Sequence, residues 1–557
     1  MSRRLVCLFY MLIILMIPGV RHSTHVDIVV YGGGFAGCAA VHNAAMLVPD
    51  KSVLLIVPEP VSELGGLGTV GGQNFTDIRL WKDKIVTQGT FGQWYNAGGG
   101  QFYNTARMAQ IIAKDLAQFP NLQIMYSNDI SLVELKDKKI NKIHIYPLDR
   151  DESGSVSWQE GLTVISAGVF IDASDDGRLA RMADAPHTVG RQDWPTQYLT
   201  DKELTSSYTY QQAATLMFKV SGLEMPDIPQ TLGDFTFTRD GSGSWGLAGG
   251  SKTWNSNALV IGFNERYKAE GLAIKPINAA QDGAGSDEWW VNTLLVSNVD
   301  GRAHDRDRKT PAYPRDTAPG HLSVEQAWIK ARQMLGNPHF IEALRQFCVN
   351  DGAGQYGFGK AELVLDDDGK PVVGEVMYIR ESIHGRLTTK QVNFNTENIN
   401  YAVTTKEAQK AGNSATNGED TGNYADRIGL GYYMMDINAY RPEDLNKGGA
   451  YQWPVTDAIR PDWRETGGEP ENPVYLPYRM LIVENIKNLL VSGYATGCSS
   501  FAWAELRVLP NLAVLGDAAG AAAARAVAYD ENPGDFTEVS INWVQDKLRA
   551  FGSRLDK

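Results

Sequence analysis

The sequence from Val26 to Val57 has the pattern of a strand, a glycine-rich turn, a helix and a second strand. The β-branched run VDIVVY leads into Gly32, Gly34 and Gly37, and the Ala-rich stretch that follows has helical spacing. Glycines at this spacing allow a tight bend, close approach of the backbone to a pyrophosphate, and close packing of helix on strand. The pattern predicts a Rossmann-like βαβ unit that binds a dinucleotide at a helix N-terminus. The residues expected around the pyrophosphate are Gly32, Gly33, Gly34, Phe35, Ala36 and Gly37.

An acidic residue after the second strand supports this interpretation. Glu59 follows the strand Val53–Val57 and could accept hydrogen bonds from an adenosine ribose hydroxyl. A second Gly-x-Gly-x-x-Gly match, from Gly352 to Gly357, follows a helical segment and precedes no helix, so we interpret it as a loop. Without a second nucleotide site, the bound dinucleotide is either the hydride carrier itself or a flavin dinucleotide. A glycine turn that only packs a plain βαβ unit is the alternative to dinucleotide binding.

Four further segments indicate which of these two cofactors is bound. They are SELGGLGTVGGQNF, VFIDASDDGRLARMADAP, YIRESIHG and the C-terminal residues 488–528. Together they resemble the FAD-dependent oxidoreductases of the bacterial secreted, xanthan-lyase-associated type, which have a glutathione-reductase-like FAD fold. The resemblance implies that the cofactor is FAD.

The same resemblance implies positions for further cofactor contacts. The backbone of the first segment would pass close to the flavin, and the second segment would end a strand at the cofactor, although Asp175 stands where the family usually has Gly. The last segment would form a helix that starts at Gly516 and points its positive end at the flavin. Asp517 is placed like a ribityl-binding acid. The implied contacts are Gly65, Gly66, Gly68, Thr69, Asp172, Ala173, Ser174, Gly516, Asp517 and Gly520.

The resemblance also implies catalytic candidates. Arg380 and Glu381 match an Arg-Glu-Ser segment that could hold an ion pair near the substrate, although a structural pair would look the same. Arg507 matches a family arginine that could steady an anionic substrate or reduced flavin. Ser500 stands where the family commonly has a histidine base. His384 is the best remaining imidazole for that role, with a satisfied surface histidine as the alternative.

Cys498 is a further candidate in the same C-terminal segment. It could act as a nucleophile or as a covalent attachment point for the flavin, whereas a small buried residue is the plainer interpretation. No metal site is expected, because His304, Asp305 and Asp307 are adjacent in a segment that reads as a solvated surface loop, residues 298–321.

The order of these segments predicts an α/β fold. A Rossmann-like FAD-binding domain, discontinuous and built from both chain ends, would carry an inserted α+β substrate domain. Within the insertion, SVEQAWIKARQMLGNPHFIEALRQF reads as two helices broken at Gly336 and Pro338. The expected boundaries are 1–23 for a signal peptide, 24–187 and 476–557 for the FAD-binding domain, 188–375 for the substrate domain, and 376–475 for interface segments with a polar loop at 404–421.

The first residues indicate export. Arg3 and Arg4 precede an apolar run of 16 residues, Leu5–Val20, which is shorter than the roughly 20 residues of a membrane-spanning helix. We expect a signal peptide cleaved between about Val20 and Thr24, and hence a secreted, periplasmic or cell-envelope protein; an uncleaved membrane anchor is the alternative. The net charge of −13 argues against nucleic acid as a partner.

The resemblance implies an oxidoreductase that transfers hydride to flavin from a C–H bond next to a hydroxyl or amine. A small-molecule, sugar-like substrate is suggested by five tryptophans of the central region, because flat rings stack on sugar faces; core packing explains these rings equally well. They are Trp194, Trp245, Trp254, Trp289 and Trp290. The alternatives are an FAD-containing lyase or isomerase, and a secreted carbohydrate-binding protein with structural FAD. The sequence identifies no electron acceptor.

Overall fold

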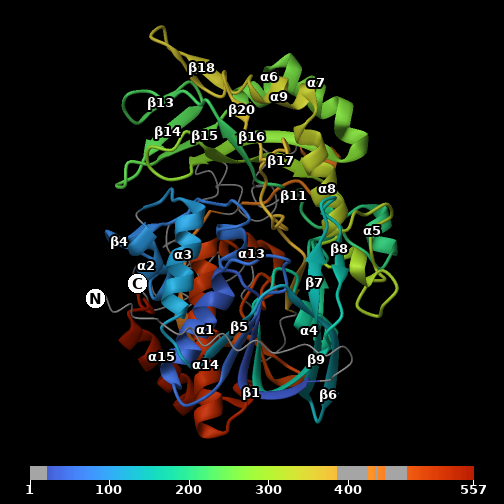
Figure 1. Ribbon diagram of the computed structural model, residues 1–557, viewed down its shortest axis with the longest axis vertical. Coiled ribbons are helices and arrows are strands. Elements are labelled where there is room, and N and C mark those ends of the chain that lie inside the picture. Colours follow the sequence, from blue (N-terminus) through green and yellow to red (C-terminus); the bar gives the residue numbers. More distant parts are fainter. Residues whose placement is uncertain (1–21, 99, 386–423, 435, 446–472) are drawn as a thin grey trace, which may run out of the picture.

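The computed structural model describes residues 22–98, 100–385, 424–434, 436–445 and 473–557. Two sheets occupy the two halves of the molecule along its long axis (Figure 1). The lower one is a nine-stranded mixed sheet, and the upper one is an eight-stranded antiparallel sheet. The predicted α/β fold with an inserted domain is therefore confirmed. The polar loop at 404–421 and nearly all of the predicted signal peptide lie outside the described residues.

Parallel strands from both chain ends form the centre of the lower sheet. Their order is β25 (Ile486–Val491), β9 (Thr163–Asp172), β1 (His22–Tyr31), β2 (Val53–Ile56) and β5 (Leu122–Met125). The antiparallel strand β24 (Ile482–Val483) extends the edge beside β25. Because β25 pairs in parallel with β9, the C-terminal segment completes a sheet that the N-terminal segment starts. The buried β-branched runs fit a parallel sheet that is covered on both faces.

Two apolar helices pack against each other beside this sheet. They are α1 (Phe35–Leu47) and α14 (Leu509–Tyr529), and α2 (Thr90–Gly98), α3 (Thr105–Leu116) and α15 (Glu538–Phe551) surround them. A Cβ atom on Gly516 would lie 2.1 Å from the carbonyl oxygen of Ala36, and one on Gly520 would lie 2.1 Å from that of Ala40. These two glycines therefore permit contact between the helix backbones.

The predicted start of the last helix is wrong. The helix α14 begins at Leu509, about two turns before Gly516, and Pro510 lies in its first turn. Proline suits that turn because its missing N–H has no partner there in any helix. The helix is long and apolar enough to span a membrane by composition, but 83% of the apolar window is buried inside the protein, as in a core helix.

A three-stranded meander extends the lower sheet. Strands β6 (Asn128–Lys136), β7 (Lys139–Arg150) and β8 (Val156–Trp158) follow one another, and β7 pairs antiparallel with β9. The short helix α4 (Arg178–Met182) follows β9. These elements bring residues of the lower domain next to the inserted domain.

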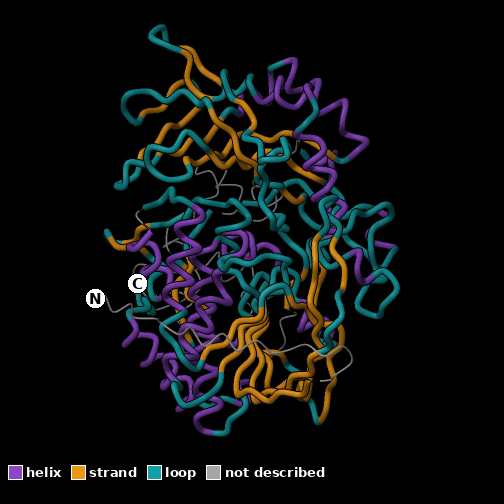
Figure 2. The backbone as a smooth tube through the Cα atoms, viewed as in Figure 1, coloured by secondary structure: helices purple, strands orange, loops and turns teal. Residues whose placement is uncertain are grey.

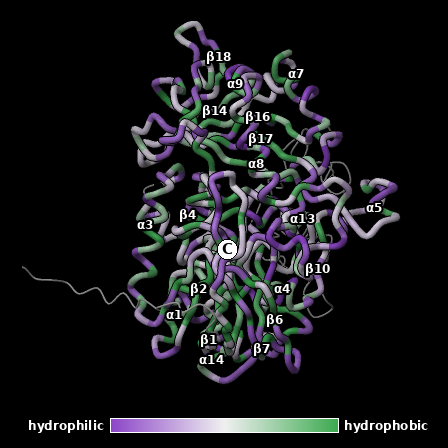
Figure 3. Tube along the Cα trace, turned by 45° about the vertical axis from the view of Figure 1, so that its right-hand side comes forward, coloured by the Kyte–Doolittle hydropathy of each residue, from purple (hydrophilic) through white to green (hydrophobic). Residues whose placement is uncertain are grey.

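The upper sheet has the order β13 (Gln230–Leu232), β14 (Phe235–Arg239), β15 (Trp245–Gly249), β16 (Leu272–Gln281), β17 (Trp289–Val296), β12 (Phe218–Ser221) and β20 (Glu362–Leu363), and β11 (Ala214–Thr215) also pairs with β17. The helices α6 (Ser251–Ser256), α7 (Ala258–Tyr267) and α9 (Pro338–Leu344) lie above this sheet, and α8 (Val324–Leu335) lies at its side (Figures 1 and 2). Figure 3 shows hydrophobic residues along the strands of both sheets.

The predicted pair of helices in the insertion is confirmed. Ser323 and Gln326 form a capping box at the start of α8, and Gly336 ends that helix. Asn337 caps α9, and Pro338 occupies its first position. The local residues therefore suffice to break one apolar segment into two helices.

Small two-stranded sheets and one short helix complete the region between the two large sheets. Strand β10 (His187–Val189) pairs with β21 (Ile383–Gly385), and β22 (Arg427–Gly431) pairs with β23 (Val474–Pro477). The helix α13 (Ser500–Leu506) directly precedes α14. Two hairpins and one short helix lie at the periphery. The hairpins are β3 (Leu80–Trp81) with β4 (Lys84–Ile85), and β18 (Cys348–Asn350) with β19 (Gln355–Gly357), and the helix is α5 (Asp201–Thr205).

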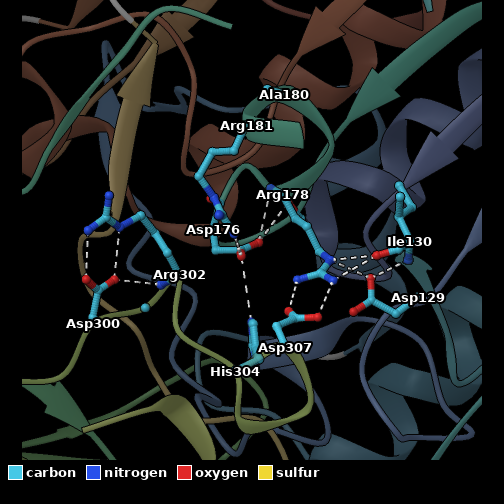
Figure 4. A network of polar contacts seen from close by, with 12 residues as sticks. Asp129, Ile130, Asp176, Arg178, Ala180, Arg181, Asp300, Arg302, His304 and Asp307 are labelled. Carbon is cyan, nitrogen blue, oxygen red and sulfur yellow. Dashed lines mark hydrogen bonds and ion pairs between the residues drawn. The ribbon is translucent and has the colours of Figure 1, made fainter. Parts of the chain in front are cut away.

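The segment predicted as a solvated surface loop instead forms a buried ion-pair network (Figure 4). Arg178 of α4 binds Asp307 through two bonds of 2.5 and 3.1 Å, and its Nε lies 3.1 Å from Asp129 Oδ1. Arg306 Nη2 also contacts Asp129, at 2.5 Å. These side chains are at most 5% exposed, and each charge of the inserted domain meets an opposite charge of the lower domain, which offsets the cost of burying it. The network therefore joins the two domains.

We expect Asp307→Ala to lower the free energy of unfolding by about 3–5 kcal/mol, because it removes one carboxylate from a buried guanidinium. Asp305→Ala is the matched control on the same turn, since the Asp305 carboxylate pairs with Arg308 at the surface and with no other described cation, and it should cost less than about 1 kcal/mol. Denaturant unfolding of both variants measures the difference. Equal effects would show that the network does not stabilise the fold.

Candidate functional site

The first glycine turn leaves open space at the N-terminus of α1. A Cβ on Gly32, whose φ is +122°, would lie 2.5 Å from the carbonyl carbon of Ala173, and one on Gly37 would lie 1.8 Å from Gly32 O. A Cβ on Gly33 would meet Val57, whereas one on Gly34 meets no atom within 4 Å. Close packing therefore requires Gly32 and Gly37. Gly34 instead faces a space where a pyrophosphate could approach the N–H groups of Phe35 and Ala36.

The second glycine segment lies directly against this turn. Gly65 N–H donates to Gly33 O at 2.8 Å, and a Cβ on Gly66 would lie 3.1 Å from Gly34 Cα. A Cβ on Gly68 would lie 2.7 Å from the Phe35 ring and 2.8 Å from Leu509, in the first turn of α14. The segment from Gly65 to Thr69 thus connects the N-termini of α1 and α14. The Thr69 hydroxyl is used within this segment, where it donates to Leu64 O at 2.6 Å.

A pocket opens at the carboxyl ends of β1, β2 and β9. Its lining includes Tyr31, Glu59, Ser174 and Asp175. Glu59 Oε2 is buried and has no hydrogen-bond partner in the part of the chain that the structure describes. Burial raises the pKa of Glu59 to about 7. A buried carboxyl oxygen without a donor suits the hydroxyl groups of a ribose.

Asp172 keeps the strand end beside this pocket in shape. Its carboxylate accepts hydrogen bonds from the N–H and hydroxyl of Ser174, at 3.0 and 2.6 Å, and from Ala180 N–H, at 2.8 Å. Asp172 therefore orders the loop, while Ala173 lies against Gly32 and Ser174 lines the pocket. Asp175 does not adopt a positive φ, whereas Gly177 does, at +59°. The aspartate at the family's glycine position thus carries no backbone strain.

Asp517 is placed differently from the prediction. Its carboxylate accepts hydrogen bonds from Asn43 Nδ2 at 2.7 Å and from the N–H and hydroxyl of Thr90 at 3.1 and 2.5 Å. Burial raises its pKa to about 8. Gly516, Asp517 and Gly520 therefore hold α14 against α1 and α2 in the middle of the helix. The N-terminus of α14, which was expected at Gly516 and next to the flavin, is instead formed by Leu509 and Pro510.

The glycine turns, the open space at Gly34 and the unpartnered Glu59 define a dinucleotide-binding protein of the Rossmann-like class. The chain belongs to the FAD dependent oxidoreductase family, whose family model matches residues 27–548. It is therefore an FAD-dependent oxidoreductase, and its pocket residues fit that cofactor. No curated protein matches the sequence.

Solved structures with a similar arrangement are distant in sequence. A geranylgeranyl bacteriochlorophyll reductase-like protein from Thermoplasma acidophilum is 9% identical, with 95% of this chain and 84% of that one covered and a TM-score of 0.35. The quinol fumarate reductase FrdA of E. coli is 12% identical, with coverages of 95% and 75% and a TM-score of 0.26. The flavin-dependent brominase Bmp2 is also 12% identical, with coverages of 65% and 68% and a TM-score of 0.29.

The structure brings Arg380 and Arg507 to one carboxylate between the two sheets. Arg507 hydrogen-bonds to Asp436 and to the Tyr378 hydroxyl, and Arg380 Nη1 lies 3.7 Å from Asp436 Oδ2. The Arg380 guanidinium also lies 4.5 Å from the centre of the Tyr378 ring. We call these four residues the arginine cluster. Arg507 is the C-cap of α13 and lies two residues before Leu509, where the cofactor-side helix α14 starts.

Sequence reasoning missed two members of the arginine cluster. Tyr378 stands two residues before Arg380, so the same motif carried a signal for it. Asp436 lies in a segment without a recognisable motif, and only the tertiary fold brings it to the two arginines.

Glu381 and His384 form a second buried group. His384 Nε2 lies 2.7 Å from Glu381 Oε1, and Glu381 also accepts hydrogen bonds from Gln212 and Tyr440. His384 is fully buried, so the alternative of a surface histidine is wrong. Its Nε2 lies 3.3 Å from Ser500 Oγ. An imidazole from β21 therefore reaches the residue that replaces the family's histidine.

The protonation state of His384 argues against its predicted role as a base. Burial alone would lower the pKa of His384, but its interactions with Cys498 and Glu381 raise this pKa to about 10. Burial also raises the pKa of the Cys498 thiol. A general base must be unprotonated at the working pH. At neutral pH His384 is therefore a cation paired with Glu381, next to a neutral thiol.

We expect Gly34→Val to abolish FAD binding while the protein stays folded. The valine fits the extended backbone of Gly34, whose φ is −73°, but it fills the open space beside α1. Gly262→Val is the matched control, because Gly262 also faces open space but lies in α7, far from the cradle in sequence. Titration calorimetry with FAD and circular dichroism test both variants. FAD binding by Gly34→Val at wild-type affinity would exclude this position from the cofactor site.

Proposed function

We propose that the enzyme oxidises a C–H bond next to a hydroxyl or an amine of a small molecule at the arginine cluster. The observation that carries this proposal is the position of Arg507, directly before the helix whose first turn contacts the glycine segment. FAD, when bound, accepts the hydride that such an oxidation releases. Positive charge next to the flavin stabilises the anion that forms on reduction.

The residues of this chain have distinct tasks in the proposed reaction. The turn from Gly32 to Gly37 and the segment from Gly65 to Thr69 would hold the pyrophosphate, and Glu59 would hold the ribose. Arg380 and Arg507 would bind the oxygen or nitrogen of the substrate, with Asp436 fixing both guanidinium groups. Because these side chains are largely buried between the sheets, the substrate would react away from bulk water.

The tryptophans do not support a sugar-like substrate. Trp254 and Trp289 belong to the core of the inserted domain, and Trp290 packs against Phe75 and Phe102. Trp194 stacks on Phe501 with ring centres 5.3 Å apart. These rings are committed to packing contacts. The proposal of a polyhydroxylated substrate therefore rests on the resemblance alone, and a substrate with a single hydroxyl or amine fits the arginine cluster equally well.

Anaerobic mixing of the holoenzyme with a panel of sugars, sugar acids, hydroxy acids and amines tests the proposed function. We expect one compound class to bleach the absorbance of the oxidised flavin and to yield the matching carbonyl or imine product. Product formation without bleaching would instead identify a lyase or isomerase. Binding with neither bleaching nor product would favour a carbohydrate-binding protein that keeps FAD for structure.

We also propose that the protein is exported and its signal peptide removed, on the basis of Arg3, Arg4 and the apolar run that follows. The first buried residue of β1 is Val26, so cleavage near residues 20–24 leaves the core of that strand intact. The mature N-terminus should lie at residues 21–25, as read by N-terminal sequencing of the extracellular or periplasmic protein. A sequence that still starts at Met1 would favour the membrane anchor.

A further inference from the structure

Lys275 lies at a break in the register of the upper sheet. The pairing of β16 with β17 shifts between Ile274 and Asn278, so that residues 275–277 lie opposite Thr293 alone. Pro276 inside this bulge has no N–H to give to the ladder, and Thr293 Oγ1 donates to Lys275 O at 2.6 Å. Such bulges redirect a side chain from the regular alternation of a strand. The bulge therefore gives Lys275 a fixed position of its own.

Lys275 is a buried residue whose amine has no polar partner in the part of the chain that the structure describes. The residue is 6% exposed, and no described residue forms a hydrogen bond or an ion pair with its Nζ. A buried ammonium group without a partner is costly, because it loses its water and gains nothing in return. A neutral amine carries a much smaller cost.

Lys219 on the same sheet shows the ordinary arrangement. Its Nζ lies 2.8 Å from Asp282 and 2.6 Å from Glu288, and these hydrogen bonds outweigh burial and raise its pKa. Lys219 is thus a structural cation with two acids of its own. Lys275 is more deeply buried than Lys219, but neither Asp282 nor Glu288 contacts its amine.

The strand register places Lys275 on the side of the arginine cluster. Leu295 of β17 pairs with Ala273 of β16 and with Thr215 of β11, and Thr215 forms a β-bridge with Tyr378 of the cluster.

The charges around Lys275 come from this cluster and from Asp77. Burial lowers the pKa of Lys275 well below its ordinary value, and the charges of Arg380 and Arg507 lower it further. Asp436 and Asp77 have the opposite effect. The Asp436 carboxylate, however, already binds Arg507 and lies within 3.7 Å of Arg380, so it is shared among several cations.

We propose that Lys275 is the proton acceptor of the oxidation at the arginine cluster; this inference rests on the proposed function. The Nζ lone pair takes the proton of the substrate's hydroxyl or amino group, and an N–H bond forms. The adjacent C–H bond would break with loss of hydride, for which FAD, when bound, would be the acceptor, and a C=O or C=N bond would form. The substrate loses two electrons and two hydrogens, and no reactant beyond substrate and FAD is needed.

Lys275 suits this task better than the other basic groups of the site. Arg380 and Arg507 stay protonated at any working pH. His384 is already protonated by virtue of its pairing with Glu381. The unpartnered amine, whose pKa lies well below its ordinary value, is therefore the basic group of the described site best suited to accept the proton.

The state of the amine can be measured without a substrate. Trace acetylation of the holoenzyme with acetic anhydride over a range of pH, followed by peptide mass spectrometry, gives the titration midpoint of each lysine. The midpoint of Lys275 should lie below that of Lys219, and Arg507→Met should raise it, because that variant removes a neighbouring positive charge. A midpoint of Lys275 at or above that of Lys219 would overturn the proposal.

The catalytic role is tested with the compound that bleaches the wild-type flavin. Lys275→Ala should keep its FAD and its melting temperature but reduce the flavin roughly 10²- to 10⁴-fold more slowly. Added methylamine or ethylamine should restore part of the rate in Lys275→Ala, and the rate should no longer follow the wild-type pH profile. Lys219→Ala, with the same amines, should show neither loss nor rescue. A merely structural role for Lys275 would not give amine rescue.

The outcomes separate this inference from the proposed function. If the wild-type flavin is bleached and Lys275→Ala reduces it at the wild-type rate, the proton acceptor is another group and the proposed function stands. If no compound of the panel bleaches the wild-type flavin, the proposed function fails and the role of Lys275 fails with it. A slow Lys275→Ala without amine rescue would also overturn the assignment.

Discussion

The contact between α1 and α14 is the constraint on which the cofactor site depends. Gly516 and Gly520 are four residues apart, as are Ala36 and Ala40, so one face of each helix meets the other at the level of the backbone. Any side chain at either glycine would push the helices apart. This close approach of the two helix backbones brings Leu509, in the first turn of α14, next to Gly68 of the glycine segment. It also places Arg507, which precedes α14, on the cofactor side of the molecule. The C-terminal segment thus completes a site that the N-terminal segment begins.

Two groups of buried charges lie between the domains, and they differ in how completely they are paired. In the network around Arg178, each buried charge faces an opposite one, which is the arrangement that holds two surfaces together. The region of the arginine cluster is incompletely paired. Asp436 Oδ1 and the Tyr494 hydroxyl are buried without a hydrogen-bond partner among the described residues. The amine of the buried residue Lys275 also has no polar partner among them. Unsatisfied buried polar groups are costly in a resting structure and are typical of a place that binds a ligand.

The sequence predicted what local chemistry determines. The glycines of the first turn, the acid after β2 and the helix break at Gly336 each have a reason within a few residues of the chain, and the structure has the strand, turn, helices and pocket there. The start of α14 was missed because Val508 offers no capping side chain, although Pro510 was a usable signal. Where the reason lies in a distant segment, sequence patterns were insufficient.

The buried charges illustrate that limit. A run rich in Arg, Asp and Pro resembles any solvated loop, and nothing near Asp307 in the sequence indicates that Arg178 will cover it. Lys275 lies in a mainly apolar strand, and its significance depends on Arg380 and Arg507, which are more than a hundred residues away in the sequence. Composition and periodicity do not contain such pairings. They follow from the register of the sheets and from the insertion of one domain into the other.

Lys275 and His384 show why burial alone does not set the protonation of a basic group. Burial favours the neutral form of both side chains. His384 has Glu381 within 2.7 Å, so the carboxylate restores its charge, and the two together are a neutral pair inside the protein. Lys275 has two guanidinium groups nearby that add to the effect of burial, and the carboxylates of Asp436 and Asp77 do not offset them. The domain interface thus favours the charged form of one basic group and the neutral form of the other, which is the division of charge that a proton-coupled oxidation requires.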